Sequence, residues 1–367
     1  MTTAFFSDER CFWHGGGNYA FTLPVAGLVQ PTPGGLPENP ETKRRLRNLI
    51  EVTGLTRHLA MRRAEPATKE DLLRVHPESY LSAFKAASDA GGGELGLRTP
   101  FGAGGYEIAA LSAGLAKAAL RAVVTGEVRN AYALSRPPGH HCTADFPNGF
   151  CLLNNIAVAV RAAQAEGLLR RVAVIDWDVH HGNGTEAIFW DDPDVLTVSL
   201  HQERNYPLDT GGVEAQGGPK ALGANLNLPL PPGTGHQGYL HAMERVVLPA
   251  LDRFQPEAIV VACGFDAAAV DPLGRMLCTA ETFRCLTRMA MQAAERLCDG
   301  RLTLVHEGGY SEVYVPFCGH AVLEEMSGSD IAAPDPLAAT LAKRQPDARF
   351  DTFVRGWIDD AAEALGL

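Results

Sequence analysis

The chain has 367 residues, of which 46% are hydrophobic and 20% are charged, and its formal net charge is -11. This composition is typical of a globular protein that is long enough to bury a sizeable core, in one large domain or in two smaller ones. Its acidic balance lacks the basic footprint of proteins that bind nucleic acid or anionic membrane surfaces, so we expect neither partner.

Targeting signals and disulfides are not expected either. The first residues, MTTAFFSDER, carry acids where a signal peptide has a basic region, and no apolar run approaches the roughly 18 residues of a membrane span. We therefore expect a cytoplasmic protein. The eight cysteines form no CxxC pair and no regular spacing, which favours reduced thiols over a disulfide framework or a structural zinc site.

Short apolar runs alternate with helical patterns along the chain. Helical periodicity covers residues 108–126 and 154–167, and the apolar runs begin AYALSRPPGHH (131–141), VAVIDWDVHHGNG (172–184), VLTVSLHQ (195–202), AIVVACGFD (258–266) and LTLVHEGGY (302–310). Strands that are apolar on both faces and alternate with helices indicate a parallel sheet covered on both sides. The sequence therefore predicts one α/β domain over residues 1–367, with a mainly parallel, doubly wound central sheet flanked by helices.

Unusual polar residues follow directly after the apolar runs. They are His140 and His141, the segment 176–183, Asp266 and Tyr310. Ligands of doubly wound sheets bind at the carboxyl ends of the strands, so we expect these residues to share one site. Two stretches rich in proline and glycine, residues 30–40 and 227–235, are predicted to be long surface loops that rim a pocket.

The segment DWDVHHGNG carries candidate metal ligands. Asp178 and His180 are two residues apart, so they project to the same side if the strand geometry continues through them. Asp266 is the candidate third ligand, and a mixed set of oxygen and nitrogen donors suits zinc or a similar divalent metal with one position open for water. The alternative is a hydrogen-bonded loop without a metal, in which Asp266 caps a helix. His181 is open to a structural role in either case.

The histidine pair in RPPGHH has two interpretations. Neighbouring side chains usually diverge, so the pair by itself fits one core histidine beside one surface histidine. Beside a metal loop, His140 and His141 become candidates for general acid/base catalysis, because imidazole titrates near neutral pH. Asp176 and Asn183 are the candidate groups that orient them.

Tyr310 follows two glycines in HEGGYS. Glycines allow the backbone to approach a ligand closely, so this loop is predicted to lie at the site. A buried tyrosine usually contributes packing, with its hydroxyl bonded elsewhere. At a strand end that faces a metal, the phenol is instead placed to donate a hydrogen bond to a developing oxyanion.

These segments together resemble a known family. RPPGHH, DWDVHHGNGT, SLHQ, GFDA, DPLGRM and EGGY are similar to motifs of the zinc-dependent histone deacetylase superfamily, which includes acetylpolyamine and acetoin-utilisation proteins and shares its fold with arginases. Asn183 and the spelling DWD most resemble the class II deacetylases and the bacterial histone deacetylase-like amidohydrolases. The resemblance covers about residues 40–325, and more loosely both termini.

The resemblance implies two kinds of metal ion. One zinc ion per chain would be held by Asp178, His180 and Asp266. A structural potassium ion would be held by the Asp176 carboxylate, the Ser199 hydroxyl and the backbone carbonyls of Asp178, His180 and Leu200.

The resemblance also implies the catalytic roles. His141 becomes the general acid/base, His140 paired with Asp176 becomes its electrostatic partner, and Tyr310 becomes the oxyanion donor. Asn183 belongs to the catalytic set as the partner of a histidine. Because water is the nucleophile in this mechanism, Cys142 and Cys151 are expected to be bystanders.

An acyl-lysine tunnel is implied as well. Phe150 and Tyr206 match its two aromatic walls, and Gly149, Leu273 and Gly308 complete the predicted substrate-binding set. The second wall is commonly phenylalanine, so Tyr206 departs from the pattern in a way that affects acyl preference. A rim acid that holds the substrate backbone in many relatives has no clear match in this chain, where the nearest acid is Glu94.

The resulting prediction is a zinc-dependent amidohydrolase that removes acetyl or other short acyl groups from acylated lysine or related amines. Its substrate would be a small molecule or a peptide, and assembly into a homo-oligomer is left open. Leu273 lacks the acid that would pair with a distant ammonium group, which favours acyl-lysine-like amides. The alternatives are an acetylpolyamine hydrolase, an inactive metal-binding interaction protein and, less favoured, an arginase-like enzyme with two manganese ions that would use Asp271.

Overall fold

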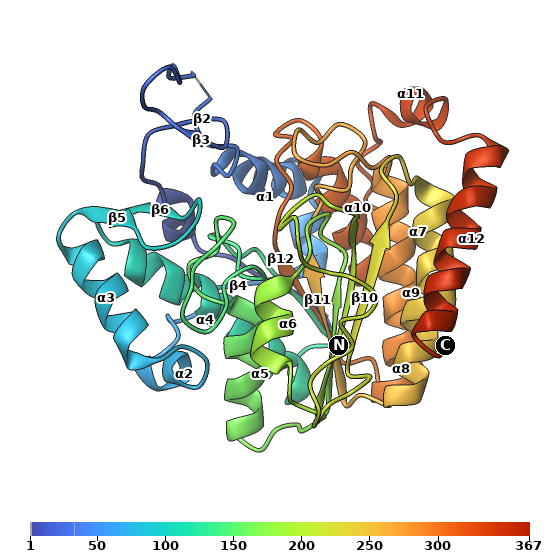
Figure 1. The fold of residues 1–367 in the computed structure, drawn as a ribbon, viewed down its shortest axis with the longest axis horizontal. Helices are drawn as coiled ribbons and strands as arrows, with labels where there is room; N and C mark the ends of the chain where they lie inside the picture. Colours follow the sequence, from blue (N-terminus) through green and yellow to red (C-terminus); the bar gives the residue numbers. More distant parts are fainter. Residues whose placement is uncertain (1, 33) are drawn as a thin grey trace.

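An eight-stranded sheet forms the centre of the computed structural model, which describes residues 2–32 and 34–367 (Figure 1). The strand order is β10-β9-β8-β11-β12-β7-β1-β4, and every neighbouring pair is parallel. The strands are β1 (Thr3–Phe6), β4 (Leu59–Arg62), β7 (Asn130–Ala133), β8 (Val172–Asp176), β9 (Val195–Gln202), β10 (Asn225–Leu230), β11 (Ala258–Cys263) and β12 (Leu302–His306).

Helices cover both faces of this sheet. Figure 1 shows α4, α5 and α6 on one side and α7, α8, α9 and α12 on the other. The helices are α1 (Glu41–Thr53), α2 (Lys69–Leu73), α3 (Glu78–Asp89), α4 (Gly105–Val124), α5 (Asn155–Ala165), α6 (Asn183–Phe189), α7 (His236–Ala242), α8 (Leu248–Phe254), α9 (Ala280–Cys298), α10 (Val315–Ser327), α11 (Ala338–Ala342) and α12 (Ala348–Ala364). The predicted doubly wound α/β fold is therefore confirmed.

Two short antiparallel hairpins lie outside the central sheet. The first pairs β2 (Tyr19–Ala20) with β3 (Leu23–Pro24), and the second pairs β5 (Gly92–Glu94) with β6 (Pro100–Gly102). The first hairpin belongs to an arm that projects from the body of the molecule (Figure 1). Within the described residues, no helix has both the length and the apolar character that crossing a bilayer requires.

The apolar runs form strands because both faces of the central sheet are covered, and burying apolar side chains on both faces is favourable. Every residue of β8 and β11 is buried at the middle of the sheet. The prediction of a loop over residues 227–235 is wrong for its first part, because β10 extends to Leu230. Pro229 is tolerated there because β10 is an edge strand of the sheet, and an edge position does not require every N–H to donate.

A buried histidine connects the outer helices to the loop that follows β7. The Nδ1 atom of His76 lies 2.8 Å from the carbonyl oxygen of Ala144, and its Nε2 atom accepts the backbone N–H of Asn154 at 3.1 Å. Because Nε2 accepts, the proton of the neutral ring is on Nδ1. Burial lowers the pKa of His76 to about 4, so the folded protein keeps this ring uncharged at neutral pH.

This arrangement predicts acid lability. As the pH falls from 7 to 5, the unfolded chain protonates His76 near its ordinary pKa of 6.5 while the folded chain does not, so stability decreases by about 2 kcal/mol. Urea unfolding at the two pH values should show a smaller decrease in His76→Gln than in the parent. The exposed His58 provides a control, since His58→Gln should keep the parental decrease. Equal decreases in all three proteins would contradict the prediction.

Candidate active site

Three predicted metal ligands meet at one point. The Nδ1 atom of His180 lies 3.0 Å from an oxygen of Asp178 and 3.0 Å from an oxygen of Asp266, and all three residues are buried. Strand β8 ends at Asp176, so strand geometry does not continue through Asp178 and His180. A turn brings them together instead, in which an Asp178 oxygen accepts the backbone N–H of His180 at 2.9 Å.

Backbone amides hold both carboxylates in place. The second oxygen of Asp178 accepts the N–H of Gly308 at 2.8 Å, and the second oxygen of Asp266 accepts the N–H of Val179 at 2.8 Å. One oxygen of each acid is thereby left facing His180. This set of two carboxylates and an imidazole fits a divalent transition metal.

The charges of this cluster show the same requirement for a cation. Burial, together with the neighbouring Asp178 carboxylate, raises the pKa of Asp266 to about 6. Burial by itself would lower the pKa of His180, but the Asp266 and Asp178 carboxylates raise it to about 10. Two fully buried carboxylates are costly unless a positive charge compensates them, and a metal ion would do so.

Each histidine of the pair has its own orienting partner. The Nδ1 atom of His140 lies 2.9 Å from an Asp176 oxygen, and the Nδ1 atom of His141 lies 2.8 Å from the Asn183 amide oxygen. Since an amide oxygen only accepts, His141 carries its proton on Nδ1 and has a free lone pair on Nε2. The structure thus brings together the pairs that the sequence suggested.

The two imidazoles differ in charge. Burial opposes protonation of His140, but the Asp178 and Asp176 carboxylates raise its pKa to about 10. Burial and the adjacent charges of His140 and His180 hold the pKa of His141 well below its ordinary value. The environment therefore favours the charged form of His140 and the neutral form of His141, whose ring centroids are 4.0 Å apart.

Glu307 is a site residue that the sequence reasoning missed. One of its oxygens accepts the N–H groups of Gly139 and His140, at 2.6 and 3.1 Å, and fixes the turn that carries the histidine pair. Burial raises the pKa of Glu307 to about 7. The available signal was its position, because it follows β12 directly, just as the other site residues follow their strands.

Cys151 also lies beside the histidine pair. Its sulfur forms a buried group with His140 and Glu307, whose potential donor atoms lie within 4.8 Å of one another. Burial raises the pKa of the Cys151 thiol well above its ordinary value. The thiol therefore stays protonated and is a poor nucleophile, which agrees with the expectation for this residue.

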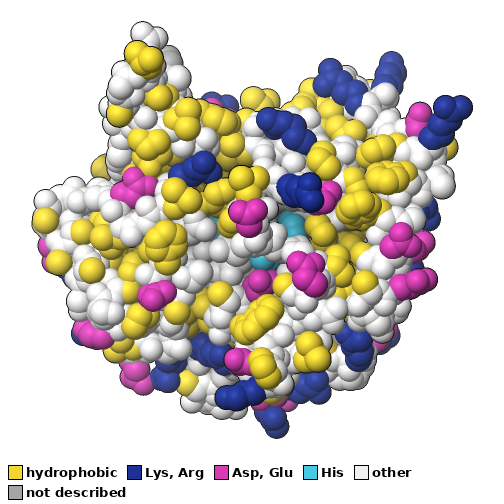
Figure 2. Space-filling view, in the orientation of Figure 1, with side chains coloured by type: hydrophobic (Ala, Val, Ile, Leu, Met, Phe, Trp, Pro, Cys, Tyr) yellow, Lys and Arg dark blue, Asp and Glu magenta, His cyan; other side chains and the backbone are white. Residues whose placement is uncertain are grey.

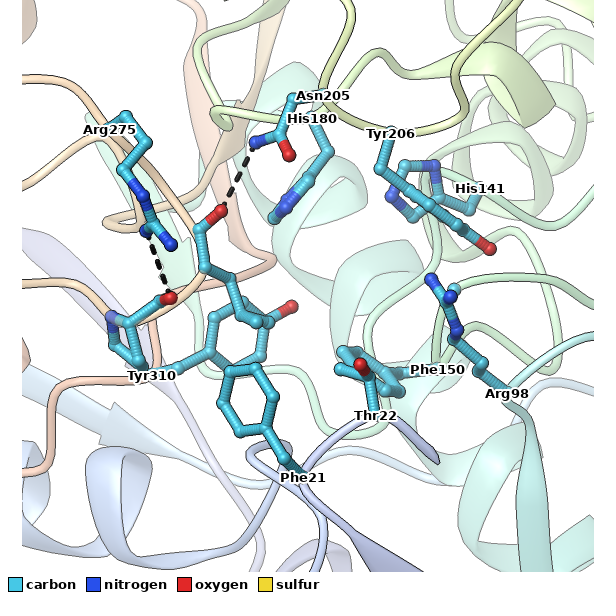
Figure 3. Close-up of a pocket in the computed structure, with 13 residues that line it drawn as sticks. Phe21, Thr22, Arg98, His141, Phe150, His180, Asn205, Tyr206, Arg275 and Tyr310 are labelled. Atoms are coloured by element: carbon cyan, nitrogen blue, oxygen red, sulfur yellow. Dashed lines mark hydrogen bonds between the residues drawn. The ribbon is translucent and has the colours of Figure 1, made fainter. Parts of the chain in front are cut away.

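A pocket of about 240 Å³ opens onto His141, His180 and Tyr310 (Figure 3). Histidine side chains are visible in the hollow near the centre of the face shown in Figure 2. The other lining residues come from several loops and are Phe21, Thr22, Arg98, Gly149, Phe150, Asn205, Tyr206, Pro272, Leu273 and Arg275. None of the described residues of the stretch 30–40 lines it, so the rim predicted there is wrong, and the arm contributes Phe21 and Thr22 instead.

Aromatic rings form the walls of the pocket. Tyr206 packs edge to face on His141 at 5.0 Å between centroids, and Phe150 packs on Tyr310 at 5.6 Å. A side chain at Gly149 would place its Cβ only 2.4 Å from the His141 ring, so glycine is needed for this close approach. The Tyr206 hydroxyl donates a hydrogen bond to the side-chain oxygen of Asn148, so its proton is already used within the protein.

Asp271 supports the loop that carries Tyr310. Its two oxygens accept the N–H groups of Tyr310 and Leu273, at 2.7 and 2.8 Å. The Asp271 carboxylate therefore joins the loop of Leu273 to the loop of Tyr310. Burial and the nearby Asp266 and Asp178 carboxylates hold the pKa of Tyr310 well above its ordinary value, so its phenol remains a hydrogen-bond donor.

The remaining predicted residues lie around this centre. Asp176 and Ser199 are register partners on β8 and β9, and Leu200 follows on β9, as a shared potassium site would need. Glu94 does not line the pocket, because its carboxylate accepts the Tyr19 hydroxyl, at 2.7 and 2.8 Å, and the Thr99 N–H, at 2.9 Å.

His181 forms its hydrogen bonds with residues other than the proposed metal ligands. Its ring nitrogens lie 3.1 Å from a Glu186 oxygen and 2.9 Å from the Thr210 hydroxyl. Its backbone N–H donates to the carbonyl of Tyr206 at 3.0 Å. His181 therefore connects α6 to the loop of Tyr206, which fits a structural role.

Comparison with known proteins finds one family that covers most of the chain. The model of the histone deacetylase domain matches residues 36–326. A histone deacetylase-like amidohydrolase from Pseudomonas aeruginosa is 58% identical over 366 residues, which cover 100% of this chain and 96% of the relative.

More distant relatives share the same domain. The human polyamine deacetylase HDAC10 is 38% identical over 284 residues, which cover 74% of this chain and 42% of the relative. The crystal structure of the HDA15 HD domain superposes with a TM-score of 0.81 at 31% identity, covering 100% of this chain and 98% of that one.

The packing of Gly308 against the ligands generates a prediction. A Cβ atom at this position would lie 2.1 Å from an Asp266 oxygen and 2.6 Å from an Asp178 oxygen, so Gly308→Ala must displace a carboxylate. We expect metal affinity to fall about tenfold to a hundredfold, measured by competition with a chelator. Gly356→Ala on α12 is the matched control, since its Cβ meets no atom within 4 Å. Parental affinity in Gly308→Ala would refute the assigned contact.

Proposed function

The chain belongs to the histone deacetylase family and is a deacetylase, and from this premise we propose that it removes acetyl or other short acyl groups from acylated lysine or related amines. The observation that supports this reaction is that three kinds of chemical group meet at one pocket. A cluster of metal ligands, a neutral histidine base and a phenol donor meet at the pocket that the aromatic walls enclose.

Zinc is the proposed metal, held by Asp178, His180 and Asp266. When bound, zinc would polarise the amide carbonyl and lower the pKa of water from 15.7 to about 7. Potassium is proposed as the structural ion of the adjacent group around Asp176 and Ser199.

His141 is the proposed general base and general acid. Its Nδ1–H is fixed by Asn183, so Nε2 is free to take a proton from the attacking water and then to give it to the leaving amine. The low pKa of His141 keeps this nitrogen unprotonated at neutral pH. The Asp178 and Asp176 carboxylates favour the charged form of His140, which would stabilise the negative charge that develops as water attacks.

Tyr310 is the proposed oxyanion donor. Its phenol remains protonated at neutral pH, and its backbone is fixed by Asp271. A hydrogen bond from this hydroxyl to the tetrahedral oxyanion would stabilise the transition state more than the ground state.

Two alternative functions, an inactive interaction protein and a polyamine deacetylase, account less well for the residues of this site. An inactive interaction protein would need neither the oriented histidines nor the buried phenol. Polyamine deacetylation is the named activity of one relative, but Leu273 at this pocket offers an ammonium group no partner. Desolvating that cation against an apolar wall costs free energy, so acyl-lysine-like amides are favoured.

Removal of one ligand tests the metal site. We expect the parent to hold one zinc ion per chain and Asp266→Ala to lose it, because the remaining two ligands cannot retain zinc against dialysis. Metal analysis by mass spectrometry measures this. Asp271→Asn is the control that should keep its zinc, and undiminished zinc in Asp266→Ala would remove Asp266 from the site.

Removal of the phenol hydroxyl tests the oxyanion donor. Tyr310→Phe should keep the fold and the zinc while kcat falls by a factor that corresponds to about 2.7–4 kcal/mol, and KM should change far less. Steady-state kinetics on an acetyl-lysine substrate measures both. Tyr106→Phe, which lies outside the pocket, is the control. A kcat within a few-fold of the parent would show that Tyr310 has another role.

A charge change at Leu273 tests substrate selection. Leu273→Glu should raise kcat/KM for acetylspermidine relative to an acetyl-lysine amide, because the new carboxylate can pair with the ammonium group. Leu273→Gln, of similar size but uncharged, should leave the ratio near the parental value. A parent that already favours acetylpolyamines would overturn the preference proposed above.

A further inference from the structure

Two arginines line the pocket outside its reactive floor. Arg98 follows β5, and Arg275 belongs to the loop after β11. Figure 3 shows them on opposite sides of the opening. Among the described residues that line this pocket there is no aspartate or glutamate, although the protein as a whole carries a net charge of -11. The lining beyond the metal ligands is therefore locally cationic.

Neither guanidinium is neutralised by a described carboxylate within ion-pair distance. Arg275 donates from Nη1 to the backbone carbonyls of Pro272 and Gly274, at 3.1 and 2.6 Å. Those contacts fix the side chain but do not compensate its charge. Its Nε and Nη2 groups donate to no other described residue, so they can still bind an anion.

Arg98 is held over the tunnel wall. Its guanidinium lies 5.2 Å from the centroid of the Tyr206 ring, and its carbonyl accepts the N–H of Phe150 at 3.0 Å. A guanidinium on an aromatic face keeps its edge donors free for a planar anion. Glu94, on the neighbouring hairpin, is bonded to Tyr19 and Thr99, and its carboxylate does not reach the pocket.

The pocket therefore has a polarity along its length. Its floor has His180 and Tyr310, and its opening carries the two arginines (Figure 3). Phe150, Tyr206 and Leu273 line the walls between them. An amide that fits this order has an acyl group at one end, an apolar chain in the middle and an anion at the other end. Arginine recognises carboxylates in particular, because its planar fork matches both oxygens.

We propose that the preferred substrates are acylated amines whose far end carries a carboxylate, of which an Nε-acyl-lysine with a free α-carboxylate is the simplest. This proposal rests on the proposed deacetylase function and adds the recognition of the part that is not hydrolysed. A polyamine would bring a cation to the same opening, where the two guanidinium groups would repel it.

The test compares two substrates that differ only in this group. Both are Nε-acetyl-lysine with the same uncharged cap on Nα, and one has a free α-carboxylate where the other has an α-carboxamide. We expect kcat/KM to be roughly threefold to tenfold higher for the carboxylate, the size expected of one or two partly exposed ion pairs. The preference should decrease as salt is added.

Arginine variants test which residues cause the preference for the carboxylate substrate. Arg98→Gln and Arg275→Gln should each lower the ratio of the two kcat/KM values, and the double variant should bring it close to one. Arg204→Gln is the matched control, since Arg204 is exposed and does not line the pocket. A parental ratio of one, or a ratio that survives the double variant, would overturn the proposal.

A binding measurement separates this proposal from the proposed reaction. If neither substrate is hydrolysed, the proposed function fails, but the dissociation constants of the same two compounds for Tyr310→Phe still report on the opening. Tighter binding of the carboxylate, lost in the double arginine variant, would support the proposal. Equal dissociation constants would overturn it even in a protein that hydrolyses both compounds.

Discussion

The structure depends on one electrostatic constraint, which is the burial of two carboxylates against one imidazole. Asp178 and Asp266 have no exposed surface, and both face His180. Buried charges of the same sign repel and lose their hydration, so the fold must supply hydrogen bonds and a cation at this point. The backbone N–H groups of Val179 and Gly308 supply the hydrogen bonds, and the proposed zinc ion would supply the cation.

The surrounding groups extend this compensation outward. The Asp178 and Asp176 carboxylates raise the pKa of His140, whereas burial, together with the adjacent His140, lowers the pKa of His141. Glu307 and Asp271 bond to backbone N–H groups and fix the two loops that carry the histidine pair and Tyr310. A reactive floor of this kind is built mostly from strand ends and short turns, whose positions the central sheet determines.

The opening of the pocket is built differently from its floor. Its residues come from the projecting arm, from the loop after β5, from the loop of Tyr206 and from the loop around Leu273. Loops of this kind tolerate change more readily than strand ends do, so substrate choice can vary while the chemistry stays the same. The two arginines belong to this variable part, which separates recognition of the substrate's far end from hydrolysis of its amide.

The sequence by itself determined the sheet class, five of the eight strands and most residues of the floor, because buried strands are recognisable as apolar runs and polar residues at their ends stand out. Only the tertiary structure revealed β1, β4 and β10, whose short or proline-containing segments lack a strong pattern. It also decided the roles of Glu307 and Arg98. Their contacts join segments far apart in the chain, and no local spacing encodes which loops fold to the same opening.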